Sequence, residues 1–119
     1  MLVSVVDDDE SVRESLPDLL NELGFEACAF SSAEGFLDSG FVNRTRCLLL
    51  DIGMPQMNGL ALQRELQIHG QKIPIIFITA RDDAAIKSQA FEQGAVGFLL
   101  KPFSDTALLA AVSAAVESA

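Results

Sequence analysis

The stretch from Leu2 to Asp9 reads LVSVVDDD, a short and mostly apolar run that ends abruptly in three acids. A second run of this kind, CLLLD, extends from Cys47 to Asp51. Apolar residues at successive positions, without regular alternation with polar ones, are typical of strands that are buried on both faces of a parallel sheet. The two stretches therefore predict buried strands that carry carboxylates at their carboxyl ends.

Outward from these two stretches, apolar runs alternate strictly with amphipathic ones. Strands are expected at residues 2–6, 25–30, 47–50, 73–78 and 96–100. Helices are expected after each strand: up to Leu23, from a Ser31/Glu34 capping box to about Asp38, over 58–67, over 82–93, and from Ser104 to the C-terminus. Five strand–helix units joined by right-handed crossovers predict an α/β domain with a five-stranded, doubly wound parallel sheet.

One residue conflicts with this pattern. Pro17 falls inside the first expected helix. Proline has no amide hydrogen and clashes with the preceding turn, at a cost of about 3 kcal/mol in a helix interior. We expect a kink or an irregular turn at this position, with the helix itself retained.

The composition limits the classes of function. The 119 residues suffice for one domain, and 17 acids against 8 Lys and Arg give a net charge of −9. Phosphate backbones are bound by clustered Lys and Arg, so DNA binding is expected only through a separate effector domain absent from this chain. No apolar run approaches the roughly 20 residues that span a bilayer, so no membrane contact is expected.

Three residues that often carry chemistry are expected to be structural here. Cys28 and Cys47 lie in strand-like stretches and form no CxxC pair, so both are expected to be reduced core residues. A disulfide or a metal pair is the alternative. His69 stands alone near the end of an expected helix, where a surface position is expected.

Polar residues stand where the expected strands end. Asp7 and Asp8 follow the first strand, Asp51 the third, Thr79 the fourth and Lys101 the fifth. Ligands of open parallel sheets collect beyond the carboxyl ends of the strands, so these side chains are expected to meet there. Clustered carboxylates repel one another unless a cation lies between them, and hard oxygen ligands suit Mg²⁺ better than zinc. An aspartate beside Mg²⁺, a lysine and a hydroxyl is equipped to attack a phosphoryl group.

Four segments of the chain carry a family resemblance: residues 5–13 (VVDDDESVR), 50–59 (LDIGMPQMNG), 76–80 (IFITA) and 94–103 (GAVGFLLKPF). In this order and spacing they resemble the receiver domain of bacterial response regulators, most closely the NarL/FixJ type. The resemblance covers essentially the whole chain, residues 1–119. It implies a flavodoxin-like (βα)5 fold with strand order 2-1-3-4-5, and a cytoplasmic role in two-component signalling and transcription regulation.

The resemblance also implies a phosphorylation site. Asp51 would accept a phosphoryl group from a histidine kinase. Asp8, Asp51 and the backbone carbonyl of Gly53 would bind Mg²⁺ directly, and Asp7 would help through a water molecule. Asp9 lies outside this set and is expected near the start of the first helix.

The remaining implied roles concern switching. Lys101 would pair with Asp51 or its phosphoryl oxygen, Thr79 would hydrogen-bond the phosphoryl group, and Phe98 would swing inward with Thr79. The Lys101–Pro102 peptide bond would be cis. The face formed by the fourth helix, fifth strand and fifth helix would then control a homodimer or an output domain. Such a domain is no enzyme beyond its own phosphorylation and dephosphorylation.

Two alternatives stay open at this point. The same aspartate nucleophile could belong to a small-molecule phosphatase of related fold, although the short loops leave no lid or substrate pocket. The fold could also serve as an interaction module that is never phosphorylated. The apolar residues on more than one face of the last helix indicate either a docking surface for a partner or second copy, or only an alanine-rich helix.

Overall fold

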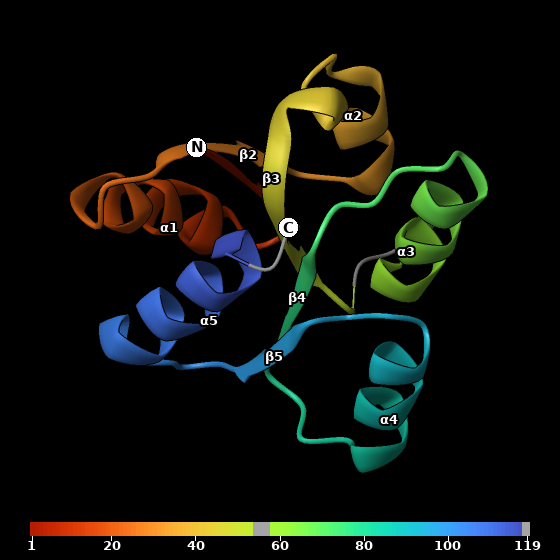
Figure 1. Ribbon diagram of the computed structural model, residues 1–119. Coiled ribbons are helices and arrows are strands. Elements are labelled where there is room, and N and C mark those ends of the chain that lie inside the picture. Colours follow the sequence, from red (N-terminus) through yellow and green to blue (C-terminus); the bar gives the residue numbers. More distant parts are fainter. Residues whose placement is uncertain (54–57, 118–119) are drawn as a thin grey trace.

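The computed structural model describes residues 1–53 and 58–117 (Figure 1). The elements are β1 (Leu2–Val6), α1 (Glu10–Glu22), β2 (Glu26–Phe30), α2 (Ala33–Asp38), the 3-10 turn η1 (Val42–Arg44), β3 (Thr45–Asp51), α3 (Gly59–Ile68), β4 (Ile75–Thr79), α4 (Ala84–Glu92), β5 (Gly97–Leu100) and α5 (Asp105–Glu117). The strand order is β2-β1-β3-β4-β5 and every pair is parallel, which confirms the predicted fold class.

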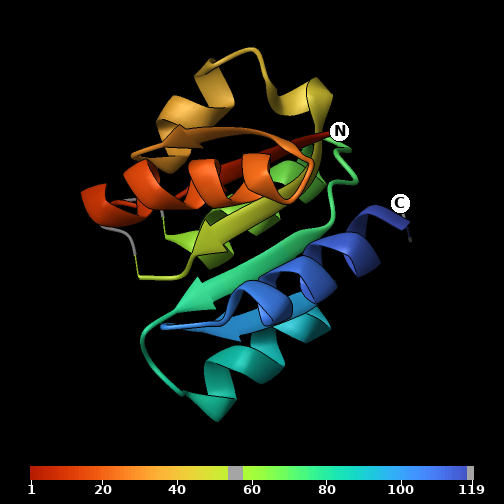
Figure 2. The same ribbon diagram turned by 90° about the vertical axis from the view of Figure 1, so that its left-hand side faces the viewer.

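The sheet separates two hydrophobic layers. Helices α1 and α5 cover one face, where Leu16, Leu20, Leu108 and Val112 are buried. Helices α2, α3 and α4 lie on the other face (Figure 1), over a layer that includes Phe36 and other buried apolar side chains. A view onto the face that carries α1 and α5 shows the strands running in one direction, with both chain ends on the side away from the arrowheads (Figure 2). The polar strand ends therefore gather at the opposite edge.

Burial follows the position of each strand in the sheet. Strands β1, β3 and β4 lie inside and are buried along nearly their whole length. The edge strands β2 and β5 are mostly half-buried, because each has a neighbour on one side only. The prediction that the strands are buried on both faces is thus confirmed for the three inner strands and wrong for the two edge strands, β2 and β5.

Two local predictions meet the structure with different outcomes. Helix α1 runs without interruption through Pro17, so the helix is retained as expected, whereas the expected irregular turn does not occur between Glu10 and Glu22. The capping box at Ser31 and Glu34 is wrong by one residue, because the N-cap is Ser32, whose hydroxyl accepts a hydrogen bond from the Gly35 amide at 3.0 Å. Ser32 has the extended backbone of an N-cap residue (φ −151°, ψ 159°), and the helix begins at the next residue, Ala33.

The two cysteines are free thiols, as expected, but only Cys47 of the two is a core residue. It is buried, whereas Cys28 is half-buried on the edge strand β2. Burial raises the pKa of Cys47 to about 12, so this thiol stays protonated at neutral pH. His69 is exposed at the end of α3, where it pairs with Glu65 at 2.9 Å. Among the described residues, no helix is both long and apolar enough to pass through a membrane.

Candidate functional site

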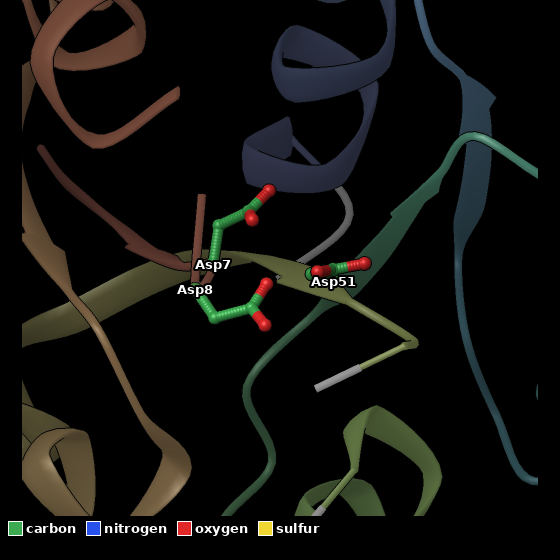
Figure 3. Close-up of side chains that lie close together, drawn as sticks. All are labelled: Asp7, Asp8 and Asp51. Carbon is green, nitrogen blue, oxygen red and sulfur yellow. The ribbon is translucent and has the colours of Figure 1, made fainter. Parts of the chain in front are cut away.

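Three carboxylates from two neighbouring strands meet at the carboxyl edge of the sheet. Asp7 and Asp8 follow β1, and Asp51 is the last residue of β3 (Figure 3). One oxygen of each carboxylate lies within 4.8 Å of the other two. Asp7 is fully buried and Asp51 is 8% exposed, whereas Asp8 faces solvent. The sequence pattern therefore identified a real cluster, with one open side that a ligand could reach.

The fifth strand supplies a cation to this cluster. The Lys101 ammonium lies 2.7 Å from Asp7 Oδ2, across 94 residues of chain. This contact differs from the expected pairing with Asp51. The reason is geometric: the Asp7 carboxylate is completely buried, and the lysine side chain, 22% exposed, offers it a counter-charge. The Lys101–Pro102 bond is cis, as expected.

The buried aspartate Asp7 has two further contacts that the sequence did not reveal. Its Oδ1 accepts a hydrogen bond from the Asp9 amide at 2.9 Å, and its backbone carbonyl accepts one from Arg13 at 3.1 Å. Asp9 itself caps α1 by accepting from the Ser11 amide, which confirms its expected place at the start of the helix. The first turn of α1 thus holds the end of β1 in place.

Asp51 has an unusual electrostatic environment. Burial raises its pKa from 3.8 to about 6, against the stabilising hydrogen bond from the Gly53 amide at 3.2 Å. The nearby Asp7 charge raises this pKa further, whereas the Lys101 charge lowers it. Asp51 is therefore ionised at neutral pH at a free-energy cost, and a bound cation would relieve that cost.

The start of α3 packs directly on the backbone of Asp51. A Cβ atom at Gly59 would lie 2.7 Å from the Asp51 carbonyl oxygen and 2.9 Å from a ring carbon of Phe77. The Gly59 amide donates to the Ile52 carbonyl at 3.3 Å, which holds the helix against the end of β3. Only glycine permits this approach, so Gly59 helps to position the carboxylate although it carries no side chain.

Gly59→Ala is accordingly expected to destabilise the protein by about 1–3 kcal/mol, despite alanine's better helix propensity, because the added methyl must displace backbone. Gly53→Ala is the matched control, since its Cβ would meet no atom of the described residues closer than Asp51 Oδ1 at 4.0 Å. Urea unfolding measures the free energy of unfolding of both variants. Equal stability for the two would contradict the close packing at Gly59.

Thr79 and Phe98 lie on neighbouring strands, at different depths. Thr79 is 6% exposed at the end of β4, and its hydroxyl accepts a hydrogen bond from the Arg81 amide at 3.1 Å. Phe98 on β5 is half-buried, and the Lys87 ammonium lies 5.8 Å from its ring centroid. Thr79 thus stands at the same sheet edge as the acid cluster, whereas Phe98 lies farther from it and contacts α4.

The donor set fits a hard divalent cation. Carboxylate oxygens from Asp7, Asp8 and Asp51 are the ligand type that Mg²⁺ prefers, and the described residues bring no histidine or cysteine to the cluster. A cavity of about 310 Å³ lies at the carboxyl ends of β3 and β4, lined by Ile52, Gly53, Thr79, Arg81, Asp83 and Ile86. It adjoins the cluster through Ile52 and Gly53, the residues that follow Asp51, and the three carboxylates are not among its lining residues.

Comparison with known sequences supports the same interpretation. A sequence model of the response regulator receiver domain matches residues 3–113. The response regulator protein TodT of Pseudomonas putida is 42% identical over 120 residues, covering 99% of this chain and 52% of TodT. Nodulation protein W of Bradyrhizobium diazoefficiens is 47% identical, covering 98% and 51%. Transcriptional regulatory protein FixJ of Azorhizobium caulinodans is 40% identical, covering 96% and 54%. The chain spans about half the length of these curated relatives.

Solved structures agree with the sequence relatives. The crystal structure of FixJ-N superposes with a TM-score of 0.89 at 39% identity, covering 99% of this chain and 94% of that chain. The chemotaxis protein CheY4 of Vibrio cholerae superposes with a TM-score of 0.87 at 26% identity, covering 96% and 97%. In both, nearly the whole solved chain corresponds to the domain described above.

Proposed function

Since this chain belongs to the response regulator receiver domain family of two-component signalling systems, we propose that Asp51 is its phosphoryl acceptor. The observation that carries the proposal is the buried Asp51 within 4.8 Å of two other carboxylates at the carboxyl edge of the sheet. Such an arrangement is costly unless a cation neutralises part of its charge, and perturbed ionisable groups of this kind cluster at functional sites.

The metal is assigned to the open side of the cluster. Receiver domains bind Mg²⁺ at an acidic pocket, and here Asp8, Asp51 and the Gly53 carbonyl would hold it, with Asp7 acting through water. When bound, Mg²⁺ neutralises charge on the phosphoryl oxygens. The exposed Asp8 is the ligand that an arriving cation reaches first.

The reaction is a single displacement at phosphorus. An Asp51 carboxylate oxygen attacks the phosphorus of a phosphohistidine, and a new O–P bond forms. The P–N bond breaks, and its electron pair stays on the imidazole nitrogen of the kinase. The positive charge of Lys101 stabilises the transferred group, and Thr79 donates its hydroxyl hydrogen to a phosphoryl oxygen.

Lys101 would redirect its ammonium from the Asp7 carboxylate toward a phosphoryl oxygen. The Thr79 hydroxyl accepts a hydrogen bond from the Arg81 amide and still has its own hydrogen to donate, so it can bind a phosphoryl oxygen without losing that contact. Phe98 would then move toward the space that Thr79 leaves as it approaches the phosphoryl group. We assign the response to a population shift between two states, since the Lys101 ammonium has two alternative acceptors.

The output surface is the face of α4, β5 and α5. Four apolar side chains are exposed there or at its border: Phe91, Val96, Leu100 and Leu109, with exposed fractions between 38% and 48%. We propose that a second copy of the chain or an output domain covers this face, and that its affinity depends on phosphorylation. The curated relatives include transcriptional regulatory proteins about twice as long, so any DNA contact is assigned to a separate domain. A cytoplasmic location is proposed from the family alone.

Intact-mass measurement after incubation with acetyl phosphate and Mg²⁺ tests the acceptor. The wild type is expected to gain one phosphoryl group, and Asp51→Asn none. Labelling of Asp51→Asn to the same extent would refute the assignment. The rival phosphatase hypothesis is judged by steady-state turnover of acetyl phosphate with the same protein preparation. Rapid multiple turnover without an accumulated phosphoprotein would favour the hydrolase.

A further inference from the structure

Helix α4 is weakly embedded in the domain. Ala90 is its single buried residue and Ile86 is half-buried, whereas the other residues from Ala84 to Glu92 are exposed. Helix α5, by contrast, buries Leu108, Val112 and Ala115. Apolar burial contributes most of the free energy that holds a helix in place, so α4 depends on few contacts.

The carboxyl end of α4 is held by side chains of α3. Gln63, which is 1% exposed, donates from Nε2 to the Ala90 carbonyl at 3.3 Å. Gln67 donates from Nε2 to the Gln93 carbonyl. These carbonyls lie at the helix end, where backbone acceptors lack intrahelical donors. The Ala90 carbonyl also accepts from the Ala95 amide at 3.0 Å, so Gln63 gives it a second hydrogen bond. Helices α3 and α4 stand next to each other (Figure 1), and the two amides join them at this end.

The amino end of α4 has no such attachment to α3 among the described residues. Its N-cap is Asp83, a side chain that accepts from the Ala85 and Ile86 amides of the same helix. Two cavities flank this half: the one of about 310 Å³ beside Thr79 and another of about 290 Å³ that includes Lys87 and Phe98. The amino half therefore has space to move on both sides, and its own cap can move with it.

We propose that Gln63 and Gln67 form an amide clamp that fixes the carboxyl end of α4, so that the amino half pivots about this clamp when Asp51 is phosphorylated. The inference rests on the proposed function for its trigger, and it adds positioning residues that lie outside the acid site. Thr79 is joined to the amino half by the short segment 80–83, which transmits the displacement.

The clamp divides the output surface into two parts. Phe91 and Val96 lie at the clamped end of α4. Leu100, the last residue of β5, lies toward the acid cluster and pairs with Thr79 of β4 in the strand register. A partner would therefore keep its contacts at the clamped end in both states. Its contacts near Leu100 would depend on phosphorylation.

Amide hydrogen exchange, followed residue by residue by NMR, tests the clamp. The backbone amides of Gln93, Gly94 and Ala95 donate to the last carbonyls of α4, so their exchange rates monitor its carboxyl end. The Lys87 amide donates to the Asp83 carbonyl, so its exchange rate monitors the amino half. In the Gln63→Met, Gln67→Met double variant, exchange at the carboxyl end should rise about fivefold for each hydrogen bond removed. Gln67→Met alone alters an exposed residue and serves as a second variant with little risk to folding.

Gln71→Met is the matched control, because the side-chain amide of Gln71 donates to Asn43 Oδ1 at 2.9 Å and not to a carbonyl of α4. The free energy of unfolding is a poor measure of the clamp. Methionine at position 63 also removes the buried Gln63 Oε1, which has no hydrogen-bond partner among the described residues, and that removal stabilises the variant while the lost hydrogen bond destabilises it. After acetyl phosphate and Mg²⁺, the wild-type Lys87 amide should change its exchange rate, while the carboxyl-end rates stay within about twofold.

Three results would count against the proposal, each against a different part. Unchanged carboxyl-end exchange in both glutamine variants would overturn the clamp. Equal changes at both ends of the wild-type helix on phosphorylation would overturn the pivot. A wild type that takes up no phosphoryl group would refute the proposed function and the pivot with it, whereas the clamp is still decided by the unphosphorylated variants.

Discussion

Lys101→Met is expected to destabilise the protein by about 3–5 kcal/mol in the absence of Mg²⁺. The variant leaves the fully buried Asp7 carboxylate with the Asp9 amide and without its counter-charge. Loss of one partner of a buried ion pair costs more than the pair itself contributes, because the remaining charge keeps its desolvation penalty. Urea unfolding at pH 7.5, about one and a half pH units above the Asp51 pKa of about 6, measures the loss of stability.

Two comparisons isolate the cause. Asp7→Asn combined with Lys101→Met removes both charges, so the double variant should recover much of the stability. Lys72→Met alters an exposed lysine that forms none of the ion pairs seen between described residues, and it should stay within about 0.5 kcal/mol of the wild type. Mg²⁺ should stabilise Lys101→Met more than the wild type, since it supplies positive charge to the same cluster. A Lys101→Met variant as stable as Lys72→Met would contradict the role of the pair.

Asp51→Asn is expected to stabilise the metal-free protein by about 3 kcal/mol at neutral pH. The folded-state pKa of Asp51 is about 6 and the reference value is 3.8, so the folded protein binds this proton more tightly than the unfolded chain. The contribution of Asp51 to the free energy of unfolding therefore falls as pH rises from about 4 to about 6, and stays low above that. Asparagine removes the buried charge and can keep the acceptor for the Gly53 amide.

The pH dependence of the stability difference tests whether the raised pKa of Asp51 is its cause. The stability difference between Asp51→Asn and the wild type should be small below pH 4 and should grow through the interval from about 4 to about 6. Asp82→Asn, at an exposed carboxylate, should show no such growth. Saturating Mg²⁺ should shrink the difference at pH 7, because the cation stabilises ionised Asp51. A difference that is constant across this range would contradict the raised pKa.

Most of the site could be predicted because its residues occupy strand ends. Asp7, Asp51, Thr79 and Lys101 each follow an apolar run, and parallel strands bring their carboxyl ends to one edge. The partner of Lys101 could not be predicted in this way. Its choice of Asp7 depends on burial, which arises from the packing of helices and strands distant in the chain.

Other features depended equally on packing. The sequence misplaces the cap of α2 by one residue because Ser31 and Ser32 are both good caps, and only the backbone conformation shows that Ser32 is the cap. The glutamines of α3 look like ordinary polar residues of an amphipathic helix. Their role at the end of α4 arises only when α3 and α4 lie next to each other on the same face of the sheet.

The amino-acid sequence by itself determined the order of strands and helices, the α/β class and the edge of the sheet at which the acids gather. These properties follow from local patterns, namely apolar runs, turn residues and the direction of parallel strands. The tertiary structure alone decided which charges pair, how far the pKa of Asp51 rises and where α4 is anchored. Those properties depend on distances and desolvation between segments far apart in the chain, and no local pattern encodes them.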